Sequence, residues 1–215
     1  MFRIDSFLTA RKFLSPQYID NNIYCVSDLG GTLNLYRMEY GGSVPNPLLP
    51  PQTALQNPAL MDGYLFNVFP GLDKILVMLD QDGNEAYQPM LIPQDGGYPV
   101  PAFRGLDSED SVICLLCDVE QNLVYLNVSS HLEEKYTAML GNLENGKLEV
   151  LGSSPWGSYP SAHTHDHRLV IIEDGYGAGD NVLYLVDRQD GNKKTVLLGI
   201  PLEERNTGEE YPHPG

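Results

Sequence analysis

The sequence predicts an all-β fold built from a repeated unit of antiparallel strands. The 215 residues include 21 Gly and 16 Pro, a composition that requires many turns and leaves little room for long helices. Short apolar runs recur along the chain, each followed by turn residues. Only residues 130–139 have a pattern compatible with a helix, so the strands are not separated by the helices that a parallel α/β sheet needs.

The first two strands of each repeat are apolar runs separated by a loop. The first runs span 23–28, 75–80, 123–127 and 169–174, and their starts are 52, 48 and 46 residues apart. The second runs span 33–36, 87–92, 136–140 and 182–186. Because this spacing recurs, each repeat is predicted to fold as one supersecondary unit.

A glycine turn and a third apolar run complete the meander. The turns lie at 41–42, 95–97, 145–146 and 190–191, and the clearest third runs are 147–151 and 193–198. Asp-Gly and Asn-Gly supply the positive φ angles that tight hairpins require. Successive runs are therefore expected to pair as antiparallel neighbours.

A further strand precedes the first run of each repeat, at 7–14, 64–69, 111–117 and 158–162. Four short strands per repeat of this length are typical of a β-propeller blade. We therefore predict a stack of four four-stranded antiparallel blades at about 8–50, 52–103, 107–151 and 155–200. Residues 201–215, rich in Glu, Pro and Gly, are expected to be a tail or linker.

Several acids and glycines are assigned to inter-strand turns. The set is Asp28, Asp80, Asp174, Gly42, Gly97, Gly146 and Gly191. The segment starting at Asp80 resembles the beginning of a calcium loop, but Glu85 and Leu91 stand where an EF-hand needs Gly and Glu. We therefore expect these acids to accept backbone N–H groups, and we predict no cofactor.

Charge and apolar content limit the partners. With 13 Lys and Arg against 29 Asp and Glu, the formal net charge is −16, which disfavours nucleic acid and anionic membrane surfaces. The sequence has no apolar run of 18 residues, and its N-terminal residues do not resemble a signal peptide, so a cytoplasmic location is expected.

The three cysteines are predicted to be reduced, packed thiols. Cys114 and Cys117 lie in one predicted strand. Residues three apart on a regular strand point to opposite faces, so this pair is expected neither to form a disulfide nor to bind zinc.

Two stretches resemble a known repeat. Residues 22–42 and 80–97 are similar to the propeller repeat that precedes the catalytic domain in prolyl oligopeptidase and acylaminoacyl peptidase-like serine peptidases. The resemblance implies a domain that covers a hydrolase site and restricts entry to small peptides. The G-x-S-x-G nucleophile motif of those peptidases is missing, because the serines of 152–157 have the wrong spacing. No catalytic residue is therefore assigned, and we expect a non-catalytic propeller region whose possible partner is an α/β-hydrolase domain.

Two other functions stay open. One is a free-standing scaffold that binds a protein or peptide through loops at one end of the blade axis. The other is a metal-dependent hydrolase, similar to lactonase-like propellers, that uses His163, His165 and His167. These histidines would share one face of a strand, but the repeat places 164–167 in a turn, so solvated turn histidines are expected.

Closure of the ring is a further question. No spare strand remains to close the four blades into a ring, so the outer faces of the first and last blades would be exposed to water. The sequence therefore predicts self-association through these faces, for example as two halves of an eight-blade ring, or a missing partner domain.

Overall fold

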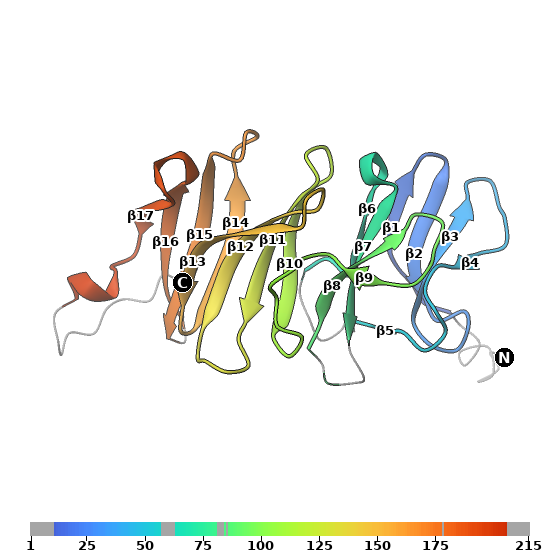
Figure 1. Ribbon diagram of the computed structural model, residues 1–215, viewed down its shortest axis with the longest axis horizontal. Helices are drawn as coiled ribbons and strands as arrows, with labels where there is room; N and C mark the ends of the chain where they lie inside the picture. The colour runs from blue at the N-terminus through green and yellow to red at the C-terminus, as the bar shows by residue number, and fades with distance from the viewer. Residues whose placement is uncertain (1–10, 57–62, 81–83, 85, 178, 206–215) are drawn as a thin grey trace, which may run out of the picture.

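The computed structural model describes residues 11–56, 63–80, 84, 86–177 and 179–205. It confirms the all-β prediction: the described strands form four antiparallel sheets, joined by turns and three single-turn 3-10 helices. Figure 1 shows the sheets side by side along the long axis, from the blue N-terminal sheet to the orange and red C-terminal sheet. Each sheet corresponds to one blade.

The outermost strand of each of the first two blades is very short. Blade one contains β1 (Phe13–Ile19), β2 (Asn22–Ser27), β3 (Asn34–Glu39) and β4 (Asn46–Pro47). Blade two contains β5 (Ala54–Leu55), β6 (Phe66–Phe69), β7 (Lys74–Asp80), β8 (Gln88–Pro93) and β9 (Val100–Pro101), with helix η1 (Pro70–Leu72) between β6 and β7. Both β5 and β6 pair with β7, so two short strands share the inner edge of this blade.

The last two blades have four full strands each. Blade three contains β10 (Ser111–Asp118), β11 (Leu123–Ser129), β12 (Tyr136–Asn142) and β13 (Lys147–Ser154). Blade four contains β14 (Gly157–His163), β15 (Leu169–Gly177), β16 (Asp180–Asp187) and β17 (Lys193–Leu198), with η2 (Arg188–Asp190) before β17 and η3 (Leu202–Glu204) after it. The expected tail at 201–215 is described up to Arg205, whose guanidinium pairs with Asp180 at 2.8 Å. Residues 206–215 lie outside the described part.

The inner strand of blade one differs from the prediction of residues 7–14. The structure places β1 at Phe13–Ile19, and residues 1–10 lie outside the described part. Pro16 lies within this strand at a register shift between Leu14 and Gln17. An edge strand tolerates proline because its outward N–H positions need no ladder partner, which apolar patterning alone does not show.

Three apolar clusters join the blades in sequence. Strand β7 shows how one strand serves two of them: Ile75 and Val77 pack toward blade one, whereas Leu76 and Met78 pack toward blade three. The third cluster lies between blades three and four and includes Tyr125 and Ile172. This alternation follows from the two-residue period of a strand, and it makes each central sheet apolar on both faces.

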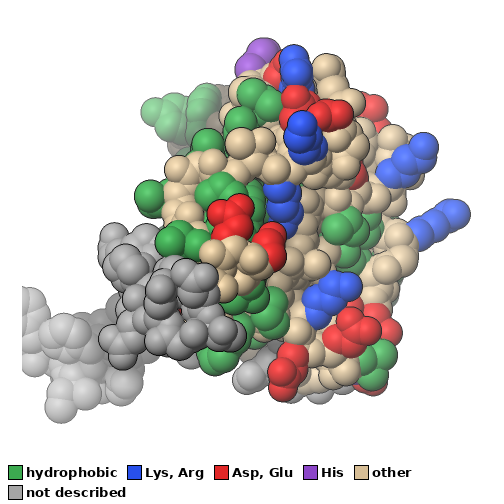
Figure 2. Space-filling model, turned by 90° about the vertical axis from the view of Figure 1, so that its left-hand side faces the viewer, with side chains coloured by type: hydrophobic (Ala, Val, Ile, Leu, Met, Phe, Trp, Pro, Cys, Tyr) green, Lys and Arg blue, Asp and Glu red, His purple; other side chains and the backbone are tan. Residues whose placement is uncertain are grey.

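The four blades form an open row. Blade one and blade four lie at opposite ends of the long axis, and in the described part of the chain no further blade covers their outer faces (Figure 1). On blade four, Leu183 and Leu185 alternate with buried residues and stay partly exposed, and Leu198, which pairs with Leu183, is exposed. Figure 2 shows hydrophobic side chains on this outer face among charged ones.

The predicted turn residues fall into two groups. The four glycines lie in the connections after β3, β8, β12 and β16, with positive φ angles: Gly42, Gly97, Gly146 and Gly191. Asp28 follows β2, and its Oδ1 accepts the Lys12 N–H at 2.9 Å. Asp80 is the last residue of β7, where the connection to β8 begins. The assignment of Asp174 to a turn is wrong, because this residue is buried within β15, which continues to Gly177.

The prediction that Cys114 and Cys117 face opposite sides is also wrong. The register of β10 shifts between Cys114 and Leu116, which inserts one extra residue and turns both cysteines to the same face. Their sulfur atoms are 3.5 Å apart. All three cysteines are free thiols, with Cys25 and Cys114 buried.

Candidate functional site

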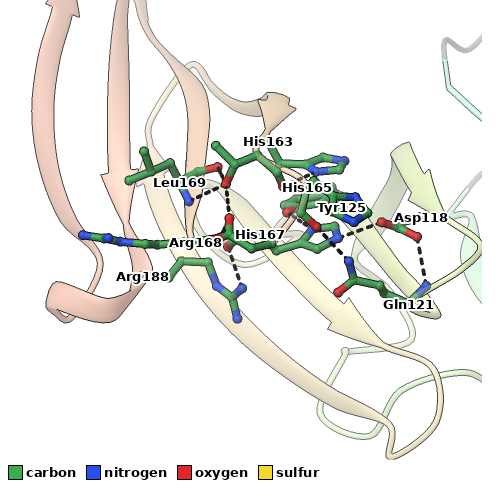
Figure 3. Close-up of polar contacts among 11 residues, drawn as sticks. Asp118, Gln121, Tyr125, His163, His165, His167, Arg168, Leu169 and Arg188 are labelled. Carbon is green, nitrogen blue, oxygen red and sulfur yellow. Dashed lines mark hydrogen bonds and ion pairs between the residues drawn. The ribbon is translucent and has the colours of Figure 1, made fainter.

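The three histidines of the candidate metal site lie in or beside the turn between β14 and β15 (Figure 3). His163 ends β14, whereas His165 and His167 belong to the turn, as the repeat predicted. The expectation that they are solvated holds for His165 but is wrong for His167, whose exposed fraction is 1%. The turn folds His167 back against blade three, where it has a φ angle of 53°.

His167 joins two residues of blade three. The Tyr125 hydroxyl, on β11, lies 2.7 Å from His167 Nδ1, and Asp118 Oδ2, at the end of β10, lies 2.8 Å from His167 Nε2. A neutral imidazole with its proton on Nε2 satisfies both contacts, because it accepts from the tyrosine and donates to the carboxylate. The resulting chain runs Tyr125, His167, Asp118.

Aromatic stacking with His163 adds to these hydrogen bonds. The His163 ring stacks on His167, with ring centroids 4.3 Å apart, and on Tyr125, with centroids 4.9 Å apart. Gln121 adds two bonds: its backbone N–H donates to Asp118 Oδ1 at 2.9 Å, and its Nε2 donates to the His165 carbonyl at 2.7 Å. The turn of blade four is therefore held against the β10–β11 turn of blade three.

An ion pair adds a second link between the same two blades. The Arg188 guanidinium donates to Glu149 on β13 at 2.6 Å and to the His167 carbonyl at 2.8 Å. The hydrogen bond from Arg188 lowers the pKa of Glu149, which keeps the pair ionised. Arg188 thus holds the His167 backbone while Tyr125 and Asp118 hold its ring.

The electrostatic surroundings of His167 keep its imidazole neutral. Burial lowers the pKa of His167, although the hydrogen bond to Asp118 opposes this effect. Partial burial raises the pKa of Asp118, but hydrogen bonds from Gln121 and His167 outweigh it, so the net shift is downward. Burial also raises the pKa of Tyr125. At neutral pH we therefore assign a carboxylate, a neutral imidazole and a phenol.

A second polar network lies within blade four and contacts blade three through one hydrogen bond. Asp174 on β15 accepts the Ser158 hydroxyl at 2.6 Å and the Lys194 ammonium at 2.6 Å. Asn127 on β11 donates to the Ser158 carbonyl at 2.7 Å. Sequence patterning did not reveal this cluster, because its members come from four different strands that are far apart in the chain.

The first network links blades three and four, whereas the second lies mostly within blade four. His167, Ser158 and Asp174 are buried, and each makes its hydrogen bonds to protein groups. Within the ranges that the structure describes, no group of three or more His, Cys, Asp or Glu side chains is placed to hold a metal ion. The Ser158 hydroxyl donates to a carboxylate that an ammonium already neutralises, an arrangement that does not activate a serine as a nucleophile.

An open hollow lies at the opposite end of the strands of the same two blades. It has a volume of about 540 Å³ and is lined by residues 129–136 of the β11–β12 connection and by Pro155 and Trp156 of the β13–β14 connection. Trp156 is 61% exposed and Leu132 is 78% exposed. In an antiparallel meander these two connections lie at one end of the strands and the β14–β15 turn lies at the other end. The hollow is therefore separate from the histidine cluster.

Acidic side chains outnumber basic ones at the rim of the hollow, whose lining also includes Lys135 beside Glu133. Glu133 and Glu134 belong to its lining, and His131 contacts Asp110 at 2.8 Å and Glu109 at 3.4 Å. The hydrogen bond to Asp110 raises the pKa of His131. Sequence patterning did not show that the β11–β12 connection faces Trp156, because the two segments meet only in the folded sheets.

Comparison with solved structures identifies the fold. The chain is similar to a protein assigned as TolB from Agrobacterium tumefaciens, with a TM-score of 0.57 and 14% identity over 89% of this chain. It is similar to a protein assigned as a dipeptidyl aminopeptidase IV from Bacteroides ovatus, with a TM-score of 0.57 and 15% identity over 87% of this chain. A prolyl endopeptidase structure matches with a TM-score of 0.50 and 11% identity over 82% of this chain.

These matches define the class as a β-propeller. The chain spans 64%, 29% and 24% of the three matched chains, so it corresponds to part of each. No protein-family model matches the sequence, and no curated protein matches it significantly. In the described ranges, none of the helices has the length and apolar character needed to cross a membrane.

Proposed function

We propose that this chain is a non-catalytic propeller region that works by binding, comparable to the substrate-gating propeller of a prolyl oligopeptidase-like serine peptidase. The likeness to peptidase propellers supports this proposal at the level of the fold. The polar networks around His167 and Asp174 support it chemically, because their ionisable groups pair with other protein groups, either between blades three and four or within blade four. In a binding role the loops would contact the ligand, and loops are the segments that vary most in sequence.

The hollow between the β11–β12 and β13–β14 connections is the observation that carries the proposal. Two large apolar side chains, Trp156 and Leu132, stand exposed on its two walls. Exposed aromatic side chains in concave sites are common anchors for ligands. Carboxylates on its rim favour a ligand with positive charge, and Trp156 offers a ring face for a cation. The proposed ligand is an extended peptide with an apolar residue next to Lys or Arg.

Intrinsic fluorescence provides a direct test, because the chain has a single tryptophan. Titration with short peptides that combine Lys or Arg with Leu or Phe is expected to shift and saturate the Trp156 emission. Peptides with Glu in place of the cation are expected to bind at least about tenfold more weakly, since a rim ion pair and its repulsive counterpart differ by about 1.4 kcal/mol.

The variant Leu132→Ser is expected to weaken binding, whereas Tyr98→Ser, an exposed position in the β8–β9 connection of blade two, serves as the matched control. If the emission does not respond to any of these peptides, in a protein with normal circular dichroism, the hollow does not bind them and this part of the proposal is wrong.

The non-catalytic part of the proposal has its own test. We expect no peptide hydrolysis above buffer and no covalent labelling by a fluorophosphonate probe, because the buried Ser158 network holds a carboxylate and an ammonium rather than an imidazole base. Labelling of any serine in the folded chain would overturn it. Zinc titration addresses the metal-dependent hydrolase: stoichiometric binding that is lost in His163→Ala would favour that function instead.

A further inference from the structure

Cys114 and Cys117 form a pair that neither the binding hollow nor the inter-blade networks use. Their sulfur atoms are 3.5 Å apart. A disulfide bond is about 2.05 Å long, so the sulfurs need to approach by about 1.5 Å to bond. Rotation of the side chains and a small adjustment of one strand can supply such a movement.

The bulge in β10 creates this proximity. Cys114 pairs with Leu126 and Cys117 pairs with Val124, two residues that share one face of β11. Between them Leu116 pairs with Tyr125, and Leu115 is the additional residue. Because β10 is the first strand of its sheet and a bulged strand deforms more easily than a regular ladder, the pair stands where the backbone can adjust.

The two thiols have different surroundings. Cys114 is 0% exposed, whereas Cys117 is partly exposed. The hydrogen bond with Cys117, together with burial, raises the pKa of the Cys114 thiol well above its ordinary value. An oxidant in solution therefore meets Cys117 first, and Cys114 stays protonated beside it.

The pair also lies under the segment that leads into β6. The Cys114 carbonyl accepts the Tyr64 N–H at 2.7 Å, and a Cβ on Gly63 would overlap this carbonyl. Cys114 itself belongs to the apolar cluster between blades two and three. A covalent change at the bulge is thus transmitted to the contact between these two blades.

We propose that Cys114 and Cys117 are a redox modification site that closes to a reversible disulfide at the interface of blades two and three. With hydrogen peroxide as oxidant, Cys117 loses its proton and the thiolate sulfur attacks one peroxide oxygen. The O–O bond breaks, Cys117 sulfenic acid forms, and the departing hydroxide takes up a proton as one water. The Cys114 sulfur then attacks the Cys117 sulfur, the S–O bond breaks, and the hydroxyl leaves with the thiol proton as a second water. Two thiols lose two electrons in total, and one peroxide is reduced to two waters.

Mass spectrometry of the whole chain tests this proposal. The native protein is treated with hydrogen peroxide, denatured without reductant, and alkylated with N-ethylmaleimide. We expect one alkylated cysteine, Cys25, instead of three, and a loss of about 2 Da in the fragment that holds both Cys114 and Cys117. Dithiothreitol is expected to restore all three reactive thiols.

Two variants separate the pair from other chemistry. Cys25→Ser removes the distant thiol and is expected to leave disulfide formation unchanged. Cys114→Ser removes the resolving thiol, so Cys117 is expected to proceed to sulfinic acid or to link two chains. Retention of three alkylatable thiols, or sulfinic acid at Cys117 beside a free Cys114 in the unmodified sequence, overturns the proposal. This measurement does not depend on peptide binding.

Discussion

At the scale of single residues, both the ring and the backbone of His167 are held between blades three and four. Its ring contacts the Tyr125 hydroxyl and the Asp118 carboxylate, its carbonyl accepts from Arg188, and its backbone has a left-handed φ of 53°. Asn and Asp tolerate that φ better than other side chains except Gly. A substitution by Asn thus removes the ring contacts while it keeps the backbone angle accessible.

We predict that His167→Asn lowers the free energy of unfolding by roughly 2 to 4 kcal/mol, because it leaves the buried Tyr125 hydroxyl without its acceptor and removes the imidazole donor from Asp118 Oδ2. Urea denaturation followed by circular dichroism measures this change. The same substitution at the exposed His165, whose ring makes none of these bonds, is the matched control and is expected to stay within about 0.5 kcal/mol. Equal losses at both positions would mean that the turn, not the ring, matters.

The downward shift of the His167 pKa predicts acid sensitivity. The unfolded state takes up a proton below about pH 6.5, while the folded state resists it, so stability is full above that pH and falls as the pH decreases toward the folded pKa. Denaturation midpoints between about pH 7.5 and pH 5 are expected to fall in the wild type and to fall less in His167→Asn. A parallel pH dependence in both proteins would contradict this assignment.

Other charged groups around the ring bear on that measurement. The groups facing or adjoining His167 are Asp118, Tyr125, His163, Arg188 and, through Arg188, Glu149. His131, whose pKa is raised by Asp110, changes stability in the opposite direction with pH. It is present in both proteins, so the difference between their pH profiles reports the His167 ring.

At the scale of strands, close packing depends on small residues at defined places. Gly141 in β12 lies under the Phe103 ring, which comes from the connection between blades two and three, and a Cβ there would overlap that ring. Phe103 is buried in the cluster between these blades. A glycine inside a strand is otherwise unfavourable, so its presence here is explained by the approach of the ring.

We predict that Gly141→Ala destabilises the protein by about 1 to 3 kcal/mol, since overpacking must displace the Phe103 ring. Gly177→Ala, in β15, is the matched control, because among the described residues a single side-chain atom approaches its added Cβ, at an ordinary distance of 3.8 Å. Thermal unfolding of both variants measures the difference. The double variant Gly141→Ala with Phe103→Leu is expected to recover part of the loss. A neutral Gly141→Ala would show that the ring moves freely.

The apolar runs were sufficient to predict the strands, but not their irregularities. Runs such as 75–80 and 123–127 became β7 and β11, because burial on one or both faces demands that pattern. The bulge that brings Cys114 and Cys117 together depends on pairing with β11. The continuation of β15 through Asp174 depends on Lys194 and Ser158 from other strands of the same sheet. Such contacts between distant segments leave no local sign in the sequence.

The candidate site shows the same division. The repeat placed His165 and His167 in the turn after β14, which the structure confirms. It did not predict the burial of His167, because Tyr125 and Asp118 approach from 42 and 49 residues away in the chain. Likewise the hollow at Trp156 needs the β11–β12 connection beside it.

At the scale of the whole molecule, the row of described blades leaves two sheet faces without a neighbouring sheet. Blade four exposes part of Leu183, Leu185 and Leu198, and blade one exposes Tyr18 and Tyr40, whose rings contact each other at 5.4 Å. Apolar surface in contact with water costs about 25 cal/mol per Å². The internal blades show that such faces are readily covered by another sheet.

We therefore predict that the protein self-associates through these outer faces in a concentration-dependent manner. Light scattering coupled to size exclusion measures the mass. Leu183→Asp is expected to shift the protein toward the monomer, because it places a charge on the face to be covered, whereas Tyr98→Asp, in an exposed loop of blade two, is expected to have no effect. A monomer at every concentration, without binding of a dye for apolar surface, would contradict this prediction.

The linear arrangement of the sheets also determines how the molecule should respond to mechanical force. Because the first and last sheets lie at opposite ends of the long axis, a pull on the two ends loads the three contacts between sheets in series. The contact between the last two sheets carries the hydrogen bonds of His167, the Arg188–Glu149 ion pair and the Asn127–Ser158 hydrogen bond in addition to its apolar cluster, so it should yield late. Stretching a single molecule is thus expected to give a sawtooth force trace in which the N-terminal sheets detach before the C-terminal pair.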